Sequence, residues 1–311
     1  MNVKILLMAM LVLHMTACAS ITQTPIPVSP AATPKPSPVP TPAFAFEKYG
    51  ATELDVTYCT SNDVPQKMDV YYPAAGGPWP ALLYVHGGGW SEGDKTEGAG
   101  WRRMTEHGFL VVSVNYRLAS YENKFPAMIE DVKCAVRYLR ANAAKYNLDT
   151  GHIGAIGASA GGHLVALLGL ADKSAGWDTG EYADQSSRVQ AVVTLAGPSD
   201  FTRGVYDSIT MAIYYAFDEM PGSPSEKLAA ASPVTYITPG DPPFLIIHGD
   251  KDGIVPVEQA QVLDEQLRKA GVPSQLVIVK NGTHNIDGEN MSPTAEEIAN
   301  LITSFLEEHL K

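Results

Sequence analysis

The sequence predicts a three-layer α/β fold, in which helices cover both faces of a central sheet. Short, continuous apolar runs alternate along the chain with segments of helical periodicity. Such runs are typical of parallel strands buried on both faces, and each crossover between parallel strands needs a helix. The chain has 311 residues, of which 45% are hydrophobic and 18% charged, so it has enough material for a large core.

An antiparallel pair begins the predicted sheet. The strands "TELDVTYC" (52–59) and "QKMDVYYP" (66–73) flank the turn "SNDVP". The apolar runs that follow predict strands over residues 80–86, 109–116, 152–158, 189–197, 243–249 and 274–280. Helical spacing predicts helices over residues 125–146, 161–170, 257–271 and 292–311. Residues 171–188 and 200–241 fit neither pattern, so we expect insertions there that cover a ligand site.

The first 18 residues have the pattern of an export signal. Lys4 precedes a short apolar core, and "MTAC" ends at Cys18. This pattern predicts a secretory signal over residues 1–17 that is too short for a membrane span. The cysteine resembles that of a bacterial lipoprotein signal, which implies that Cys18 is lipidated and becomes the mature N-terminus. Met15 stands where such signals usually have Leu, so a plain secretory signal with release of the protein is the alternative.

A spacer follows this cysteine. Residues 21–43 are rich in Pro, Thr and Ser, a composition that favours extended, semi-rigid chain. We therefore expect a lipidated cysteine and linker over residues 18–43 and one globular domain over residues 44–311. The expected location is the cell envelope or the extracellular space, with a membrane as partner through the lipid anchor. The formal net charge of −12 argues against nucleic acid as a partner.

Two cysteines remain in the predicted domain. In an exported protein, a disulfide between Cys59 and Cys134 can persist. The sequence does not show whether their Cα atoms lie within bonding distance, so a bridge and two buried thiols both stay open.

The stretch "GASAG" (157–161) places a serine where a predicted strand turns into a helix. In such a sharp turn, the serine is held in a strained conformation with Oγ above the sheet, and its neighbours must be small. The helix N-terminus also presents the N–H of Ala160 beside the Ser159 hydroxyl. We interpret Ser159 as a nucleophile; a glycine-rich packing turn is the alternative.

A second glycine-rich stretch, "HGGGW" (86–90), follows a buried strand. Glycines let backbone N–H groups approach a ligand closely, and acyl transfer needs such donors at the developing oxyanion. We therefore expect Gly87, Gly88 and Ala160 to form an oxyanion hole. Trp90 either lines the substrate pocket or is a core aromatic residue.

A nucleophilic serine needs a base, and the base needs an orienting acid. His284 lies in a loop after the last predicted strand, from which an imidazole can reach the serine, so we expect it to be the base. Asp252 in "HGDKDGIVP" is the expected acid, with Asp250 and Asp200 as alternatives. The order Ser159, Asp252, His284 is that of a strand–turn–helix serine hydrolase.

Four stretches together carry a family resemblance: "HGGGWSEGDK", "VNYRLA", "FPAMIEDVKCAVRYLRAN" and "GASAGGHLVALLG". They resemble α/β-hydrolase-fold serine esterases with the His-Gly-Gly-Gly oxyanion motif, and look closest to hormone-sensitive-lipase-related and acetylxylan/feruloyl esterase-like enzymes. The resemblance implies a mostly parallel, doubly wound sheet with a small cap insertion, and a triad of Ser159, Asp252 and His284.

These features predict a serine esterase that acts on short-chain acyl esters through an acyl-enzyme. The substrate is a small-molecule or polysaccharide-linked ester, with acetyl or hydroxycinnamoyl esters of plant polysaccharide as the specific hypothesis. A serine amidase or peptidase-like hydrolase, or a non-catalytic binding lipoprotein on the same fold, is the alternative. We expect no cofactor and no metal, because the sequence has no His-Glu-x-x-His motif and no paired-Cys ligand spacing.

Overall fold

A computed structural model of the chain describes residues 44–203, 208–222 and 225–311. They belong to a compact unit, Thr41–Lys311. The predicted signal, Cys18 and the linker lie outside the described residues. Within the described ranges, no helix is both long enough and apolar enough to cross a membrane.

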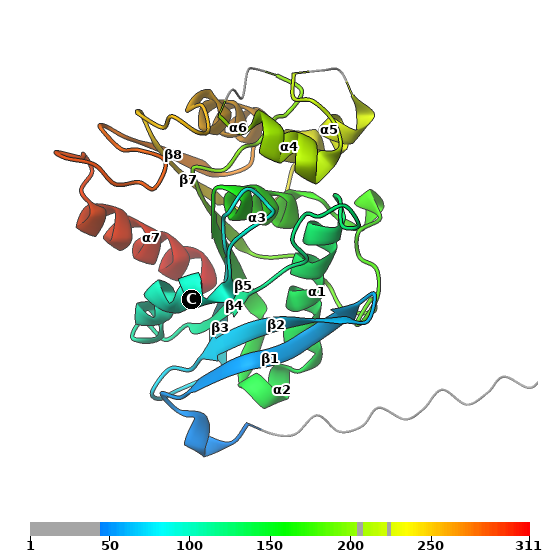
Figure 1. The fold of residues 1–311 in the computed structure, drawn as a ribbon. Coiled ribbons are helices and arrows are strands. Elements are labelled where there is room, and N and C mark those ends of the chain that lie inside the picture. The colour runs from blue at the N-terminus through cyan, green and yellow to red at the C-terminus, as the bar shows by residue number, and fades with distance from the viewer. Residues whose placement is uncertain (1–43, 204–207, 223–224) are drawn as a thin grey trace, which may run out of the picture. The chain divides into compact units, whose positions relative to one another are not determined.

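The centre of the domain is an eight-stranded mixed sheet with the order β1-β2-β4-β3-β5-β6-β7-β8 (Figure 1). The strands are β1 (Thr52–Ser61), β2 (Val64–Tyr71), β3 (Trp79–Val85), β4 (Leu110–Val114), β5 (Leu148–Ala158), β6 (Ala191–Leu195), β7 (Phe244–Gly249) and β8 (Ser274–Val279). Strand β2 pairs antiparallel with β1 and β4, and all other neighbours are parallel. The predicted α/β class with a mostly parallel, doubly wound sheet is confirmed.

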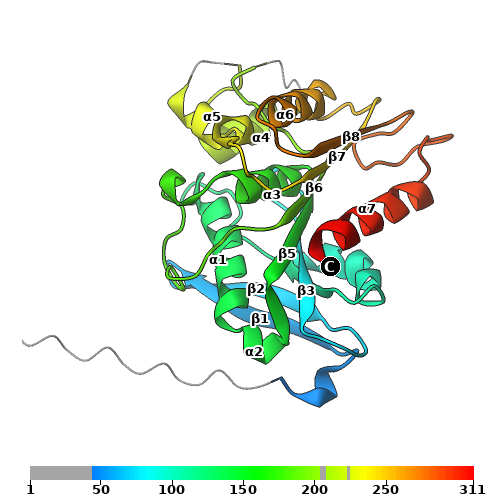
Figure 2. The same cartoon turned by 180° about the vertical axis from the view of Figure 1, so that it is seen from behind.

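Helices cover both faces of this sheet (Figure 2). They are α1 (Ala127–Ala141), α2 (Ala143–Tyr146), α3 (Ala160–Leu170), α4 (Thr210–Phe217), α5 (Glu226–Ala231), α6 (Glu258–Lys269) and α7 (Ala295–Leu310). Helices α1, α3 and α6 contribute to the core on one face. The other face is covered by α7 and by the 3-10 segment η2 (Lys95–Thr105). The predicted helix over 125–146 is divided at Asn142 into α1 and α2.

The disulfide left open by the sequence is formed. Cys59 of β1 and Cys134 of α1 are bridged, with their Cα atoms 6.4 Å apart. The bridge fastens the edge hairpin β1–β2 to a helix that packs on the sheet.

The insertion 171–188 packs against α1, and none of its residues lines a cavity at Ser159. Two buried cations of α1, Lys133 and Arg137, both pair with Asp178 at 3.1 Å, and Arg137 also donates to the carbonyl of Glu181. These contacts hold the insertion against α1. The described part of 200–241 instead forms α4 and α5, which carry the expected cap.

Candidate active site

Ser159 lies in the sharp turn between β5 and α3. Its backbone has φ 54° and ψ −120°, a conformation that costs a residue with a side chain about 1–3 kcal/mol. Two hydrogen bonds hold it: the Ser159 N–H donates to the carbonyl of Leu195 at 2.8 Å, and its carbonyl accepts the N–H of His163 at 3.0 Å. The turn therefore fixes the serine by its backbone and leaves its side chain for another task.

The small neighbours of Ser159 are required by contacts. A Cβ atom at Gly157 would lie 2.3 Å from the carbonyl oxygen of Gly161. A Cβ atom at Gly161 would lie 2.0 Å from the carbonyl oxygen of Val85 at the end of β3. Any larger residue at either position would push helix α3 away from the sheet.

The glycine loop after β3 approaches this turn directly. A Cβ atom at Gly87 would lie 3.1 Å from the carbonyl oxygen of Ala158 and 3.5 Å from Cβ of Ser159. Gly88 has φ +94°, and its carbonyl accepts the N–H groups of Ser91 and Glu92 in a tight turn. Among the described residues, no protein acceptor takes the N–H of Gly87 or Gly88. These two N–H groups are thus free to bind a ligand beside Ser159.

Two aromatic side chains support this loop from below. The hydroxyl of Tyr116 donates at 3.2 Å to the carbonyls of His86 and Gly87. The Tyr116 ring also stacks on the fully buried His86 ring, with centroids 4.3 Å apart. Burial lowers the pKa of His86, so its imidazole is neutral and its Nδ1 donates to the carbonyl of Gly87 at 2.9 Å. Sequence reasoning missed Tyr116, which reaches the loop from the segment that follows the neighbouring strand β4.

Trp90 combines both roles that the sequence left open. It is 1% exposed, and its indole N–H donates to Nδ1 of His163 at 3.1 Å. His163 in turn donates from Nε2 to the carbonyl of Ala231 at 2.7 Å, and burial lowers its pKa to about 4. Trp90 is thus a core residue, although it also lines a cavity at Ser159.

The structure brings Asp252 and His284 together. Nδ1 of His284 donates to Oδ2 of Asp252 at 2.8 Å. The Asp252 side chain is fully buried, and its Oδ1 accepts the N–H groups of Ile254 and Val255 at 2.8 and 2.9 Å. Burial alone would raise the pKa of Asp252, but hydrogen bonds from His248 and His284 outweigh it and hold the pKa well below its usual range. The carboxylate therefore stays ionised.

The other candidate acids have different partners. Oδ1 of Asp250 accepts the N–H of Asn281, and Asp200 pairs with Arg203 at 3.2 Å. The loops after β7 and β8 touch at two glycines: a Cβ atom at Gly249 would lie 2.2 Å from the carbonyl oxygen of Gly282. This close approach is what brings residues 252 and 284 within hydrogen-bond distance.

Two cavities meet at Ser159 and share the residues Ala158, Ser159, His284 and Asn285. The helix-side cavity, of about 250 Å³, lies between η2 and α7 and is further lined by Trp101, Arg103, Leu195, Ile286, Ile298 and Ile302. The glycine-loop cavity, of about 330 Å³, is further lined by Gly87, Gly88, Trp90, Glu97, Ile209 and Ile254. Ser159 and His284 thus lie at the junction of two cavities.

Within the part of the chain that the structure describes, no cluster of three or more His, Cys, Asp and Glu residues is placed to hold a metal ion.

Comparison with known proteins agrees with this geometry. The sequence model of the BD-FAE family matches residues 68–267. The chain is 34% identical to Esterase LipC of Mycobacterium tuberculosis over 236 residues, which cover 71% of this chain and 57% of LipC. It thus spans little more than half of that relative's length.

Two solved structures share the fold. A truncated carbohydrate esterase from gut microbiota superposes with a TM-score of 0.72 at 28% identity, over 86% of this chain and 99% of that one. A bifunctional GH43-CE protein of Bacteroides eggerthii superposes with a TM-score of 0.71 at 30% identity, over 85% of this chain and 38% of that one.

Proposed function

The chain belongs to the BD-FAE family and has the α/β-hydrolase fold of its esterase relatives; from this premise, we propose that it is a serine esterase that hydrolyses short-chain carboxylic esters. One observation carries the proposal. Ser159 is held in a strained turn and lines the same two cavities as His284. Nδ1 of His284 is hydrogen-bonded to the buried, ionised Asp252.

The proposed mechanism assigns a role to each group. Oγ of Ser159 attacks the ester carbonyl carbon while Nε2 of His284 takes the hydroxyl proton. Asp252 holds the imidazole in this tautomer and stabilises its charged form. The N–H groups of Gly87, Gly88 and Ala160 bind the oxyanion, and losing one such donor costs about 3 kcal/mol of transition-state stabilisation.

The second half of the cycle uses the same groups. The tetrahedral intermediate collapses, the alcohol leaves with the proton from His284, and an acyl-enzyme remains on Ser159. Water then attacks the acyl carbon, giving its proton to His284, and the acid is released as Ser159 recovers its hydroxyl.

The two cavities support a substrate with chemically different halves. The helix-side cavity is the smaller one, with Trp101 and three isoleucines in its wall, and we assign it to a short or flat acyl group. The glycine-loop cavity, with the carboxylate of Glu97 in its wall, is assigned to the alcohol. A sugar hydroxyl can donate to such a carboxylate. Together with the carbohydrate esterase among the structural relatives, this supports acetyl or hydroxycinnamoyl esters of a polysaccharide as substrates.

The location remains part of the proposal. The signal pattern ending at Cys18 and the Pro-rich residues 21–43 support an exported enzyme on a lipid anchor, with the spacer holding the domain away from the membrane. Radiolabelled fatty acid incorporation tests this placement: label is expected in the native protein and absent after Cys18→Ser. Equal labelling of both proteins would contradict it.

The test of activity compares the native protein with Ser159→Ala. Initial rates are measured on p-nitrophenyl acetate, p-nitrophenyl decanoate, methyl ferulate and the amide p-nitroacetanilide. We expect ester hydrolysis that favours acetate over decanoate, and a loss of about 10⁴-fold in Ser159→Ala. Preference for the amide would favour the amidase alternative, and equal rates for enzyme and variant would contradict the assignment of Ser159.

A further inference from the structure

Asp252 has a second imidazole partner. His248, near the end of β7, is fully buried, and its Nε2 lies 3.1 Å from Oδ2 of Asp252 and 2.9 Å from the carbonyl oxygen of Val255. Its Nδ1 is buried and has no partner among the described residues. The proton therefore lies on Nε2, which donates to both oxygens.

With this contact, the Asp252 carboxylate is bonded on every side. Oδ1 accepts two backbone N–H groups, and Oδ2 lies between His284 at 2.8 Å and His248 at 3.1 Å. Rotation of the carboxylate about its Cβ–Cγ bond would break all four contacts at once. The orientation of the oxygen that faces His284 is thus set partly from inside the core.

A buried histidine at position 248 lowers stability unless one of its hydrogen bonds serves a function. All six residues of β7 are buried, so an apolar side chain would suit position 248. A buried polar atom without a partner costs about 1–3 kcal/mol, and Nδ1 of His248 is such an atom. The bond to Asp252 is the contact that an apolar residue could not supply.

We propose that His248 is a positioning residue for hydrolysis: it holds Oδ2 of Asp252 in the orientation that His284 needs. The inference rests on the proposed function of Ser159, Asp252 and His284. His248 touches neither the substrate nor the reacting atoms, and it acts only through the carboxylate.

The test is a double-mutant cycle on the full chain with p-nitrophenyl acetate, with rates corrected for the Ser159→Ala background. We expect His248→Leu to lower kcat about tenfold with KM within twofold. His248→Gln, whose amide can donate to the carboxylate, should recover most of this loss. In an Asp252→Ala background, His248→Leu should change kcat by less than twofold, because the carboxylate through which His248 acts is absent.

His163→Leu is the matched control, because His163 is an equally buried histidine beside the site that is bonded to Trp90 and Ala231. Its effect on kcat should be the same with and without Asp252. The inference is overturned if His248→Leu loses activity equally in both backgrounds, or if His248→Gln is as impaired as His248→Leu. If His248→Leu does not fold, His248→Gln against His248→Asn decides, since the shorter amide cannot reach Asp252. An inactive native protein would instead refute the proposed function.

Discussion

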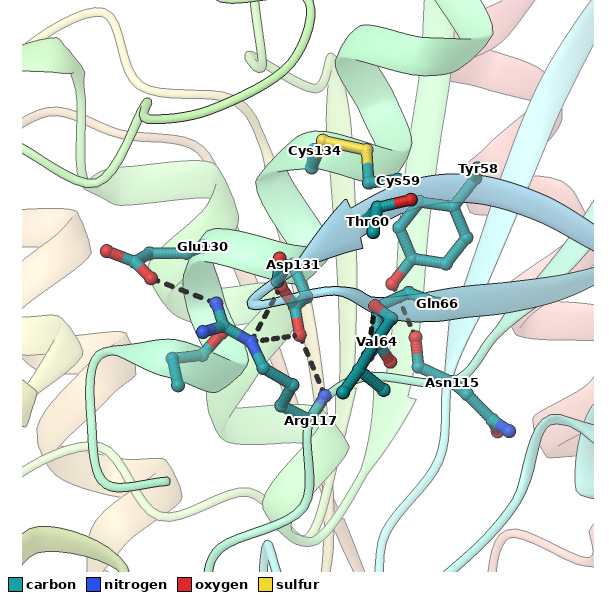
Figure 3. A network of polar contacts seen from close by, with 12 residues as sticks. Tyr58, Cys59, Thr60, Val64, Gln66, Asn115, Arg117, Glu130, Asp131 and Cys134 are labelled. Carbon is teal, nitrogen blue, oxygen red and sulfur yellow. Dashed lines mark hydrogen bonds and ion pairs between the residues drawn. A yellow bond between two sulfur atoms is a disulfide. The ribbon is translucent and has the colours of Figure 1, made fainter. Parts of the chain in front are cut away.

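The region around Ser159 and the region where the β1–β2 hairpin meets helix α1 differ in how well their buried polar groups are paired. We call the second region the staple network; it comprises the disulfide Cys59–Cys134 and the polar residues Ser61, Arg117, Glu130 and Asp131. Figure 3 shows the disulfide and the side chains of Arg117, Glu130 and Asp131. Asp131, 1% exposed, accepts hydrogen bonds from Ser61 and from both the backbone and the guanidinium of Arg117. Each of its buried charges has a partner.

The site shows the reverse. Two buried ring nitrogens, Nε2 of His86 and Nδ1 of His248, have no hydrogen-bond partner among the described residues. Both imidazoles adjoin catalytic elements: one precedes the glycine loop, and the other bonds Asp252. Unsatisfied polar atoms thus gather where we place the chemistry, and well-paired contacts elsewhere offset their cost.

Breaking the staple network should reduce stability but leave catalytic activity nearly unchanged. We expect Asp131→Ala to lower the free energy of unfolding by about 3–5 kcal/mol, because it leaves the half-buried Arg117 guanidinium with only Glu130 as an ionic partner. Urea denaturation measures this loss, and kcat at 25 °C should stay within about threefold. Ser61→Ala, which removes one hydrogen bond, should cost only about 1 kcal/mol. A fall of kcat comparable to that of Ser159→Ala would show that the network belongs to the site.

The sequence predicted the features that residues close together in the chain determine. The apolar runs identified the strands, and "GASAG" between a strand and a helix located Ser159, because the steric demand for small residues acts within a few positions. Contacts between distant segments were not predictable in this way. Tyr116 reaches the glycine loop from the segment after β4, and the pairing of Cys59 with Cys134 depends on how α1 packs on the hairpin.

Other differences have a similar cause. Three aspartates remained as candidate acids, and the contact between Gly249 and Gly282 is what brings Asp252 to His284. The 3-10 segment η2 was not predicted from helical periodicity, although Asp94 and Glu97 form a capping box at its start. The sequence also did not show how the insertion 171–188 packs, because the contact of Asp178 with two buried cations of α1 joins distant segments and has no local pattern.

The histidine that binds Trp90 beside the site should also make stability depend on pH in the acid range. Burial lowers the pKa of His163 to about 4 in the folded chain, against about 6.5 when unfolded. Between these values the unfolded chain binds more protons, so the contribution of His163 to stability is complete above pH 6.5 and is lost as the pH falls toward 4. The loss is on the order of 3 kcal/mol. We expect the free energy of unfolding to depend less steeply on pH in His163→Gln than in the native protein over this window. Equal slopes for the two proteins would contradict the assignment of this pH dependence to His163.

The smallest effect compares one chemical change at the site and next to the staple network. Tyr116 and Tyr58 are both buried, and each donates its hydroxyl to backbone carbonyl oxygen: Tyr116 to His86 and Gly87, and Tyr58 to Asn115 at 2.5 Å. Removing either hydroxyl by Tyr→Phe should cost about 1 kcal/mol of stability, because the carbonyl loses a donor.

Only Tyr116 holds the glycine loop, so only Tyr116→Phe should reduce catalysis. We expect kcat to fall about fivefold with little change in KM, because a less rigid loop binds the transition-state oxyanion more weakly while ground-state binding is retained. Tyr58→Phe should keep kcat within twofold. Steady-state kinetics and urea denaturation of both variants measure the two effects side by side. Equal kcat values in the two variants would mean that the Tyr116 hydroxyl only stabilises the fold, as the Tyr58 hydroxyl does.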